Sequence, residues 1–336
     1  MKHINVSLFV PHMGCPRSCI FCDQRAISGS GAGITREEII SACETAKKTP
    51  HEKENGEIAF FGGSFTAINR DIQKMCLETA APYLENDFSG IRISTRPDCI
   101  NEDELRFLKD HGVTAIELGA QSMDADVLIK NERGHTPEHT VNASRLIKEF
   151  GFSLGLQMMT GLYGSSDEKD VYTAKKFVEL KPDTVRIYPT TVLEGTKLAR
   201  LYRTGEYVPP ALQKSVSLCA RLLKMFNDNG IRVIRLGLHS GGDVEKNYVA
   251  GAYHPAFREL CEGEIYKTAV SLLLEGMPKG EYTVLVPPGE VSKTAGQKKS
   301  NINYFRDSGY MIKIRESDKT EKYRPALLRK ENAECI

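Results

Sequence analysis

HINVSLFVPHMGCPRSCIFCDQ (residues 3–24) joins an apolar, β-rich run to a loop that carries three cysteines. The run is typical of a buried strand that ends at the following proline. Cys15, Cys19 and Cys22 then follow in a C-x3-C-x2-C pattern. Three thiolates from one loop can converge on one iron–sulfur cluster, and a [4Fe–4S] cube held by three thiolates keeps one iron open. We therefore expect these cysteines to bind a [4Fe–4S] cluster just after the first strand.

Zinc is the alternative metal for this motif. A lone C-x2-C pair is often a zinc site, but zinc ribbons usually offer a second Cys or His pair at similar spacing. Cys43 and Cys76 lie in predicted helices at unrelated spacing, and His12 is the one nearby candidate. A zinc site of the three cysteines with His12 therefore stays open as the second interpretation.

Strand and helix patterns alternate along residues 1–240. Seven runs are predicted as strands, at 3–10, 57–63, 90–95, 114–122, 152–159, 184–189 and 231–239. Helices are predicted between them at 36–46, 71–84, 102–112, 137–151, 167–180 and 210–230. Nearly continuous apolar strands linked by helices indicate a parallel sheet covered on its outside. The predicted fold class is therefore α/β, a partial or near-closed (β/α) TIM-like barrel, with a doubly wound open sheet as the competing architecture.

The rhythm changes after residue 240. A long helix is expected at 256–276, and strands at 282–288 and 310–316 flank a basic stretch, which predicts a small C-terminal α/β appendage over 241–336. The segment from Lys293 to Arg315 carries six Lys and Arg against one Asp, with Tyr304, Phe305 and Tyr310 interleaved. Such a segment either faces RNA, with the rings stacking on bases, or is ordinary solvated surface.

The bulk composition is that of a soluble globular protein. Charged residues make up 26% and hydrophobic residues 40% of the 336 residues, and the formal net charge is +1, so no overall field selects nucleic acid or a membrane. No signal peptide is recognisable, and no apolar run approaches the roughly 18 residues of a membrane span. We expect a cytoplasmic protein without membrane contact, whose nine cysteines are thiols or metal ligands rather than disulfides.

With these features in order, the chain resembles the radical S-adenosylmethionine (SAM) superfamily. Within it, the chain is similar to the radical-SAM domain of the Elongator catalytic subunit and its bacterial relatives. Besides the cysteine motif, the likeness rests on FFGGSFTA (60–67), STRPD (94–98), ELGAQS (117–122), ERGHT (132–136), LQMMTGLYG (156–164) and RIYPTTVLEGTKL (186–198). Elongator enzymes also carry an acetyltransferase domain. The sequence ends too soon for one, so acetyl-CoA-dependent uridine chemistry is not carried over to this chain from the resemblance alone.

The resemblance implies which residues bind SAM, most of them at strand ends. They are Phe21, Gly62, Gly63, Ser64, Ser94, Arg96, Asp98, Glu117, Gln121, Gln157 and Met159. In the family the glycine segment receives the methionine amino group of SAM. Many members have an acidic residue at its third position, where this chain has Ser64, so the contact here would come from the backbone or the hydroxyl. Arg96 and Asp98 would hold the SAM carboxylate or ribose, or else form an internal ion pair.

Four further residues are candidates for contacts with the substrate or with the SAM carboxylate. Arg133 and His135 lie in the loop after the fourth strand, and Arg186 and Tyr188 end the sixth. Arg235 and His239, at the seventh strand, are weaker candidates, because a lone histidine is more often structural.

The resemblance also implies the chemistry. An external one-electron donor of the flavodoxin or ferredoxin type would reduce the cluster, and SAM would then be cleaved to a 5′-deoxyadenosyl radical that abstracts hydrogen from the substrate. The Elongator likeness and the basic segment favour tRNA as that substrate. A small metabolite, peptide or tetrapyrrole is the alternative, and a non-catalytic zinc or iron–sulfur binding module is the third hypothesis.

Overall fold

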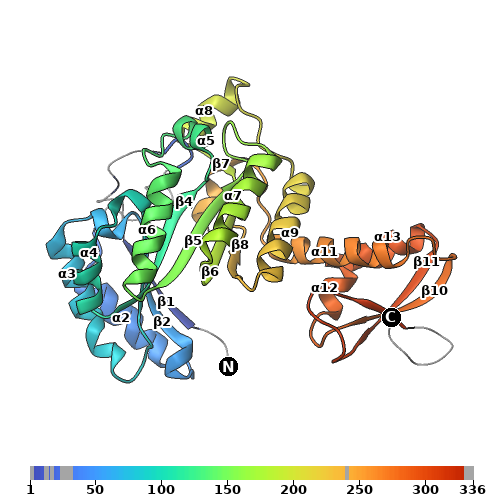
Figure 1. The fold of residues 1–336 in the computed structure, drawn as a ribbon, viewed down its shortest axis with the longest axis horizontal. Coiled ribbons are helices and arrows are strands. Elements are labelled where there is room, and N and C mark those ends of the chain that lie inside the picture. Colours follow the sequence, from blue (N-terminus) through green and yellow to red (C-terminus); the bar gives the residue numbers. More distant parts are fainter. Residues whose placement is uncertain (1–3, 11–14, 16–18, 23–32, 239–241, 329–336) are drawn as a thin grey trace.

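Seven parallel strands form the main sheet of the protein. The computed structural model describes residues 4–10, 15, 19–22, 33–238 and 242–328. The strands are β1 (Ile4–Val10), β2 (Gly56–Gly62), β3 (Ile91–Thr95), β4 (Val113–Gln121), β5 (Ser153–Thr160), β6 (Thr184–Pro189) and β8 (Arg232–Leu236). They lie in the order β1-β2-β3-β4-β5-β6-β8 and curl into a half-barrel (Figure 1). A doubly wound sheet would reverse its strand order part-way, so the predicted partial barrel is confirmed.

Helices between the strands cover the convex face of the sheet. They are α2 (Arg36–Lys47), α3 (Arg70–Ala80), α4 (Glu102–Asp110), α6 (Pro137–Glu149), α7 (Asp167–Leu180) and α9 (Leu212–Asp228), whereas the short α5 (Ala125–Lys130) lies beyond the end of β4 (Figure 1). Helix α2 begins at a capping box, in which the Thr35 hydroxyl accepts from the Glu38 N–H and the Glu38 carboxylate accepts from the Thr35 N–H. Helix α3 gives way to a 3-10 turn at Ala81–Leu84, where Pro82 cannot continue it.

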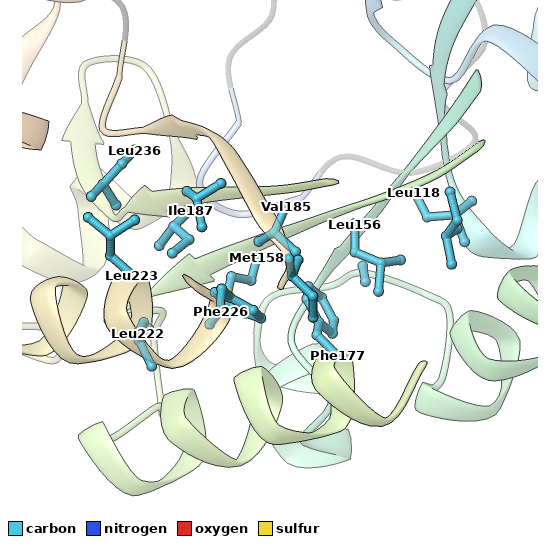
Figure 2. Close-up of a cluster of buried hydrophobic side chains, with 14 of the residues drawn as sticks. Leu118, Leu156, Met158, Phe177, Val185, Ile187, Leu222, Leu223, Phe226 and Leu236 are labelled. Atoms are coloured by element: carbon cyan, nitrogen blue, oxygen red, sulfur yellow. The ribbon is translucent and has the colours of Figure 1, made fainter. Parts of the chain in front are cut away.

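The hydrophobic core lies between the sheet and these helices. Figure 2 shows side chains from β4, β5, β6 and β8 packed against α7 and α9. The labelled members are all buried: Leu118, Leu156, Met158, Phe177, Val185, Ile187, Leu222, Leu223, Phe226 and Leu236. Because alternate residues of a strand face opposite sides, the residues between these apolar ones point to the concave face. That face is therefore available for polar groups.

The second half of the chain adds a small two-stranded sheet, a long helix and a three-stranded sheet. Strand β7 (Thr191–Leu193) pairs antiparallel with β9 (Tyr248–Gly251), and α8 (Lys197–Arg203) and α10 (Gly242–Lys246) lie between them in sequence. Helix α11 (Phe257–Leu273) packs against α9 and leads to the appendage (Figure 1). There β10 (Gly280–Val286) pairs in parallel with β11 (Tyr310–Glu316), and the chain between them forms α12 (Val291–Ala295) and α13 (Ser300–Asp307). Strand β12 (Ala326–Leu328) pairs antiparallel with β10.

The predicted β-α-β appendage is thus present, with one strand more than expected. A domain boundary at residue 240 stays a prediction. Among the described helices, none is long and apolar enough to cross a membrane.

Candidate active site

The cysteine segment lies against the strand ends of the half-barrel. Cys19 is buried and Cys15 and Cys22 are half-buried. Ile20 anchors the segment, because its N–H donates to the Asn131 carbonyl at 3.3 Å and its carbonyl accepts from the Leu198 N–H at 2.8 Å. The Ile20 side chain is also buried in a small apolar cluster with Val192, Leu198, Ala199 and Tyr207. Helix α8 and the loop after α5 therefore hold the cysteines at the mouth.

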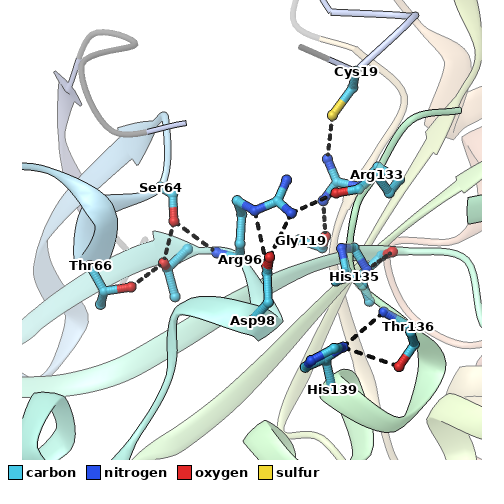
Figure 3. A network of polar contacts seen from close by, with 12 residues as sticks. Cys19, Ser64, Thr66, Arg96, Asp98, Gly119, Arg133, His135, Thr136 and His139 are labelled. Carbon is cyan, nitrogen blue, oxygen red and sulfur yellow. Dashed lines mark hydrogen bonds and ion pairs between the residues drawn. The ribbon is translucent and has the colours of Figure 1, made fainter. Parts of the chain in front are cut away.

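Arg133 connects this segment to the sheet. Its Nη1 donates to the Cys19 sulfur at 3.0 Å, and its Nη2 donates to the Gly119 carbonyl on β4 (Figure 3). The carbonyl of Arg133 in turn accepts from Nη2 of Arg96 at 2.5 Å. Burial raises the pKa of the Cys15 thiol, while the Ser64 backbone N–H, Arg96 and Arg133 act in the opposite direction. Two cysteines of the motif thus share a cationic environment made by the two arginines.

Arg96 and Asp98 form the internal ion pair that the sequence left open. Nε and Nη2 of Arg96 donate to the two carboxylate oxygens of Asp98 at 2.9 and 2.8 Å (Figure 3). Burial acts to raise the pKa of Asp98, but the bidentate bond from Arg96 outweighs it and the pKa is lowered. The pair is therefore fully charged at neutral pH, and any contact with SAM would be made by its remaining donors.

The glycine segment after β2 needs close backbone approach. Gly62 has φ +113°, and a Cβ there would lie 2.5 Å from the Val10 carbonyl oxygen. Ser64 is 1% exposed, and its hydroxyl bonds Thr95 Oγ1 at 2.7 Å and accepts from the Arg96 N–H at 3.2 Å. The hydroxyl is thus already engaged, which favours the backbone of Gly63 and Ser64 as the ligand contact at this end of the strand.

A second polar network covers the concave face lower in the half-barrel. Glu117 is 0% exposed and its carboxylate contacts Arg186 Nε at 2.7 Å and Nη2 at 2.9 Å, with Gln157 Nε2 at 2.8 Å and Arg92 Nη1 at 3.5 Å. Arg92 is held mainly by Glu57, at 2.9 and 3.0 Å. Burial alone would lower the pKa of Arg186, but Glu117 and Tyr188 outweigh it and the pKa is raised. The charges of this network cancel.

The other predicted residues fall around these two networks. Gln157 also reaches Ser94 Oγ at 3.5 Å, and Met159 is the register partner of Tyr188 on β6. Phe21 lies 5.9 Å from the Arg133 guanidinium. Gln121, at the end of β4, has φ 66°, and its buried Oε1 has no hydrogen-bond partner among the described residues.

His135 is deeply buried, with Nε2 bonded to the Ala120 carbonyl at 3.1 Å. Burial first, and then the charges of Arg133 and Arg96, lower its pKa to about 3. It is therefore neutral at physiological pH and is poorly suited to move a proton. His239 lies outside the described residues.

Several residues of the site were not predicted from the sequence. Arg92 and Glu57 belong to the inner network, and the ring of Phe61 lies 4.7 Å from the Arg186 guanidinium. Thr66 and Thr95 complete the hydrogen bonds around Ser64, at 2.6 Å from each other. The available signal was strand alternation, since a charged residue between apolar neighbours on β3 must face away from the helices.

The basic segment of the appendage is only partly suited to stacking. Tyr304 is 49% exposed, whereas Phe305 is 4% exposed and belongs to the core, so the predicted stacking role of Phe305 is wrong. Tyr310 is half-buried, with its hydroxyl donating to the Met277 carbonyl at 3.2 Å. Lys298 and Lys299 are exposed.

Comparison with known proteins agrees with this geometry. Residues 9–177 match the model of the radical SAM superfamily, and residues 182–267 match that of the Radical_SAM C-terminal domain. The chain therefore belongs to the radical SAM superfamily. The resemblance seen in the sequence is thereby confirmed, and with it the cofactors that the family binds, a [4Fe–4S] cluster and SAM.

Particular relatives narrow the likeness. The chain is 34% identical over 196 residues to the tRNA uridine(34) acetyltransferase of Methanocaldococcus jannaschii, a match over 52% of this chain and 36% of that protein. It is 29% identical over 203 residues to Elongator complex protein 3 of Mus musculus, over 54% of this chain and 37% of that protein. The chain thus spans little more than a third of these relatives.

Solved structures show the same fold. The archaeal Methanocaldococcus infernus Elp3 with an N-terminal deletion (1–46) superposes with a TM-score of 0.66 at 23% identity, over 80% of this chain and 64% of that one. Coproporphyrinogen III oxidase (HemN) from Escherichia coli superposes with a TM-score of 0.50 at 18% identity, over 68% of this chain and 53% of that one.

The residues at the mouth fit these cofactors in chemical type. Thiolates are the ligands of iron–sulfur clusters, and Arg133 and the Ser64 N–H supply donors beside two of the motif's thiols. In the part of the chain that the structure describes, no three His, Cys, Asp or Glu side chains already converge as a metal site. The fit is therefore one of donor type and location.

Proposed function

We propose that this chain is a cytoplasmic radical SAM enzyme that modifies a base of tRNA, with a flavodoxin or ferredoxin as its electron donor. The proposal for the substrate is carried by the similarity to tRNA uridine(34) acetyltransferases over about half of the chain. When bound and reduced, the cluster with SAM would supply a 5′-deoxyadenosyl radical that removes hydrogen from a C–H bond. The protein's own residues would bind and orient SAM and the substrate, and would exclude water from them.

Cys15, Cys19 and Cys22 are the proposed cluster ligands. Cluster binding would draw the three thiols together and release their protons, since thiolates are the ligands. Arg133 positions Cys19 through its 3.0 Å contact and its bond to the Gly119 carbonyl on β4. In the bound state the same guanidinium would offset part of the negative charge of the thiolates.

SAM would lie across the strand ends beside the cysteines. The backbone of Gly62, Gly63 and Ser64 would accept its amino group, because the Ser64 hydroxyl is already bonded. The free donors of the Arg96 guanidinium would face its carboxylate, since Nε and Nη2 hold Asp98. The remaining proposed contacts with SAM are Phe21, Ser94, Asp98, Glu117, Gln121, Gln157 and Met159.

Arg186 and Tyr188 are proposed to contact the substrate on the concave face. The guanidinium of Arg186 is held in place by two contacts with the Glu117 carboxylate, so it would offer the substrate donors in a fixed position. Arg133 holds the cysteine side. His135, neutral and buried, would support the loop and is not proposed as a proton carrier.

Anaerobic turnover tests the proposal. The reconstituted and reduced protein is incubated with SAM and unmodified tRNA, and mass spectrometry follows 5′-deoxyadenosine and the tRNA nucleosides. We expect 5′-deoxyadenosine together with a mass change in one nucleoside. Replacing any of Cys15, Cys19 or Cys22 with Ala should abolish both, whereas Cys43→Ala, in the buried face of α2, should keep the cluster. Cleavage of SAM with no change in any nucleoside would refute tRNA as the substrate.

Salt-dependent binding tests the basic appendage separately. Reversing the exposed Lys298 and Lys299 to Glu should weaken tRNA binding and reduce the salt slope, because each lost phosphate contact lowers the slope by about 0.7–0.9. The matched control reverses Lys48 and Lys175, which are exposed near α2 and in α7. Equal losses in both double variants would mean that only net charge matters.

A further inference from the structure

Two arginines lie side by side at the far edge of the concave face. Arg186 on β6 and Arg235 on β8 are register partners, and so are the next residues, Ile187 and Leu236. Ile187 and Leu236 are buried in the helix-covered core (Figure 2). Because neighbours along a strand face opposite sides, Arg186 and Arg235 both point to the concave face.

Only one of these two charges is neutralised by a described residue. Glu117 holds Arg186, and Glu57 holds Arg92, so the inner network is balanced without Arg235. No carboxylate of the described residues forms an ion pair with Arg235, and its Nε donates to the Gly237 carbonyl at 3.1 Å. The half-buried guanidinium therefore keeps its terminal nitrogens for another acceptor.

The surroundings make this charge costly in the free protein. Burial is the largest cause that lowers the pKa of Arg235, and the nearby guanidinium groups of Arg186 and Arg258 act in the same direction, whereas Tyr188 acts against them. Arginine nevertheless stays protonated in proteins. Arg258 is itself paired with Glu262, so among the side chains that the structure describes here the uncompensated charge is that of Arg235. A half-buried cation that faces another cation and has no ion-pair partner among the described residues is an arrangement that an anion would relieve.

The guanidinium of Arg235 lies well away from the cysteines. Arg133 and Cys19 meet the sheet at β4, and β8 lies three strands further along. At about 4.8 Å between strands, this is roughly 14 Å across the sheet. A ligand at Arg235 is therefore distinct from the amino and carboxylate groups of a SAM bound at the cysteines. Tyr188, half-buried beside both arginines, adds a hydroxyl to the same corner.

We propose that Arg235, with Tyr188, forms an anion subsite that binds a backbone phosphate of the RNA substrate. The inference rests on the proposed function, because a nucleic acid is the substrate class that brings a phosphate with every base. The planar guanidinium and the phenol would donate to the non-bridging oxygens, as forked donors do. The subsite would hold the strand on which the target base lies while the base faces the cysteine side.

Arg235→Gln tests the subsite in the cluster-loaded enzyme, with Arg232→Gln as its matched control. Arg232 lies on the same strand but is exposed. Binding of unmodified tRNA is measured over a salt series. Arg235→Gln should weaken binding roughly tenfold and lower the salt slope by about 0.7–0.9, the value of one phosphate contact. Arg232→Gln should change neither, and Arg235→Lys should restore the slope.

Thermal unfolding without RNA gives a second readout. Arg235→Gln removes a repelling charge, so its Tm should equal or exceed that of the wild type. Inorganic phosphate should raise the Tm of the wild type but not of Arg235→Gln, when compared with chloride at equal ionic strength. Acetate, as a carboxylate probe, should have a smaller effect than phosphate.

The outcomes separate the two proposals. If the wild type shows no salt-sensitive binding of tRNA, both the tRNA function and this subsite are overturned. If the wild type binds tRNA and Arg235→Gln binds it equally well with an unchanged slope, the subsite is refuted and the tRNA function stands. A larger Tm increase with acetate than with phosphate would assign the corner to a carboxylate and refute the phosphate proposal.

Discussion

Glu117→Gln removes the charge at the centre of the inner network while it preserves the shape of the side chain. The carboxylate is 0% exposed and lies 2.7 Å from Arg186 Nε and 3.5 Å from Arg92 Nη1. Arg92 keeps Glu57 as its partner, so the substitution mainly strands Arg186. The neutral amide can accept from only one of its two terminal atoms, so one of the present contacts becomes a donor facing a donor.

The magnitude follows from the burial of the pair. The side chains of Arg186 and Glu117 are 11% and 0% exposed, so solvent screens their interaction little. Removing one partner of a buried pair costs about 3–5 kcal/mol, because the other charge stays buried without compensation. The unfolding entropy of a 336-residue chain is roughly 0.7 kcal/mol/K, which converts this cost to a Tm decrease of about 4–7 °C.

Thermal unfolding of the cluster-free chain measures the effect, and a double-mutant cycle with Arg186→Met identifies its cause. If the cost is that of a stranded charge, Glu117→Gln combined with Arg186→Met should be more stable than Glu117→Gln alone, because the uncompensated cation is gone. The reasoning is refuted if Glu117→Gln unfolds at the wild-type temperature. It is equally refuted if the two substitutions add without interaction.

Other substitutions test further parts of the structure. Gly155→Ala should lower the Tm, because the new Cβ would lie 2.7 Å from Glu117 Cγ and would displace the side chain that pairs with Arg186. An unchanged Tm would show that the Glu117 side chain can move without losing its contacts. Thr35→Ala removes the capping box of α2 and should cost about 1 kcal/mol in urea unfolding. His135 has a pKa of about 3 in the folded protein and therefore binds a proton more weakly there than in the unfolded chain. The free energy of unfolding should then fall as the pH decreases from about 6.5, by up to about 1.4 kcal/mol per pH unit. His135→Gln should flatten this decline. Burial raises the pKa of Asp170 to about 6, so its protonation below that pH favours the folded protein and opposes the effect of His135. Asp170→Asn should therefore steepen the fall of the unfolding free energy with decreasing pH, measured in the same urea series.

The seven main strands could be predicted because buried parallel strands are apolar over their whole length. The predicted strand 184–189 agrees with β6, and most of the others differ from the structure by one or two residues at an end. The last strand was predicted to reach residue 239, but β8 ends at Leu236, where Gly237 turns the backbone with φ 90°. The antiparallel pair of β7 and β9 was missed, because these short strands pair across more than 50 residues, which no local pattern reports.

The site was predictable in its residue types but not in its partners. The sequence predicts Glu117 at a strand end, whereas the structure places it in the middle of β4. The sequence also indicates that a carboxylate facing the barrel needs a partner. It does not show that the partner is Arg186, 69 residues further along the chain, nor that Gln157 joins them. The same holds for Arg133, whose contact with Cys19 spans 114 residues. Such contacts depend on which strands are neighbours and in which register they pair. The sequence predicts the class of fold but not these pairings.

Strand β4 connects the two halves of the proposed chemistry. The Gly119 carbonyl accepts from Arg133, which contacts Cys19, and Glu117, two residues earlier, holds Arg186. Gly119 lies beyond the last register pair of β4 with β3 and in the gap between Leu118 and Gln121 in its pairing with β5, where its carbonyl can accept from a side chain. The same strand therefore fixes both the Arg133 contact and the Arg186 contact. A one-residue slip of β4 would turn the Glu117 side chain toward the helices and break its contact with Arg186. The spacing between a radical formed beside the cysteines and a substrate held beside β6 would therefore be set by a buried, hydrogen-bonded strand rather than by a loop.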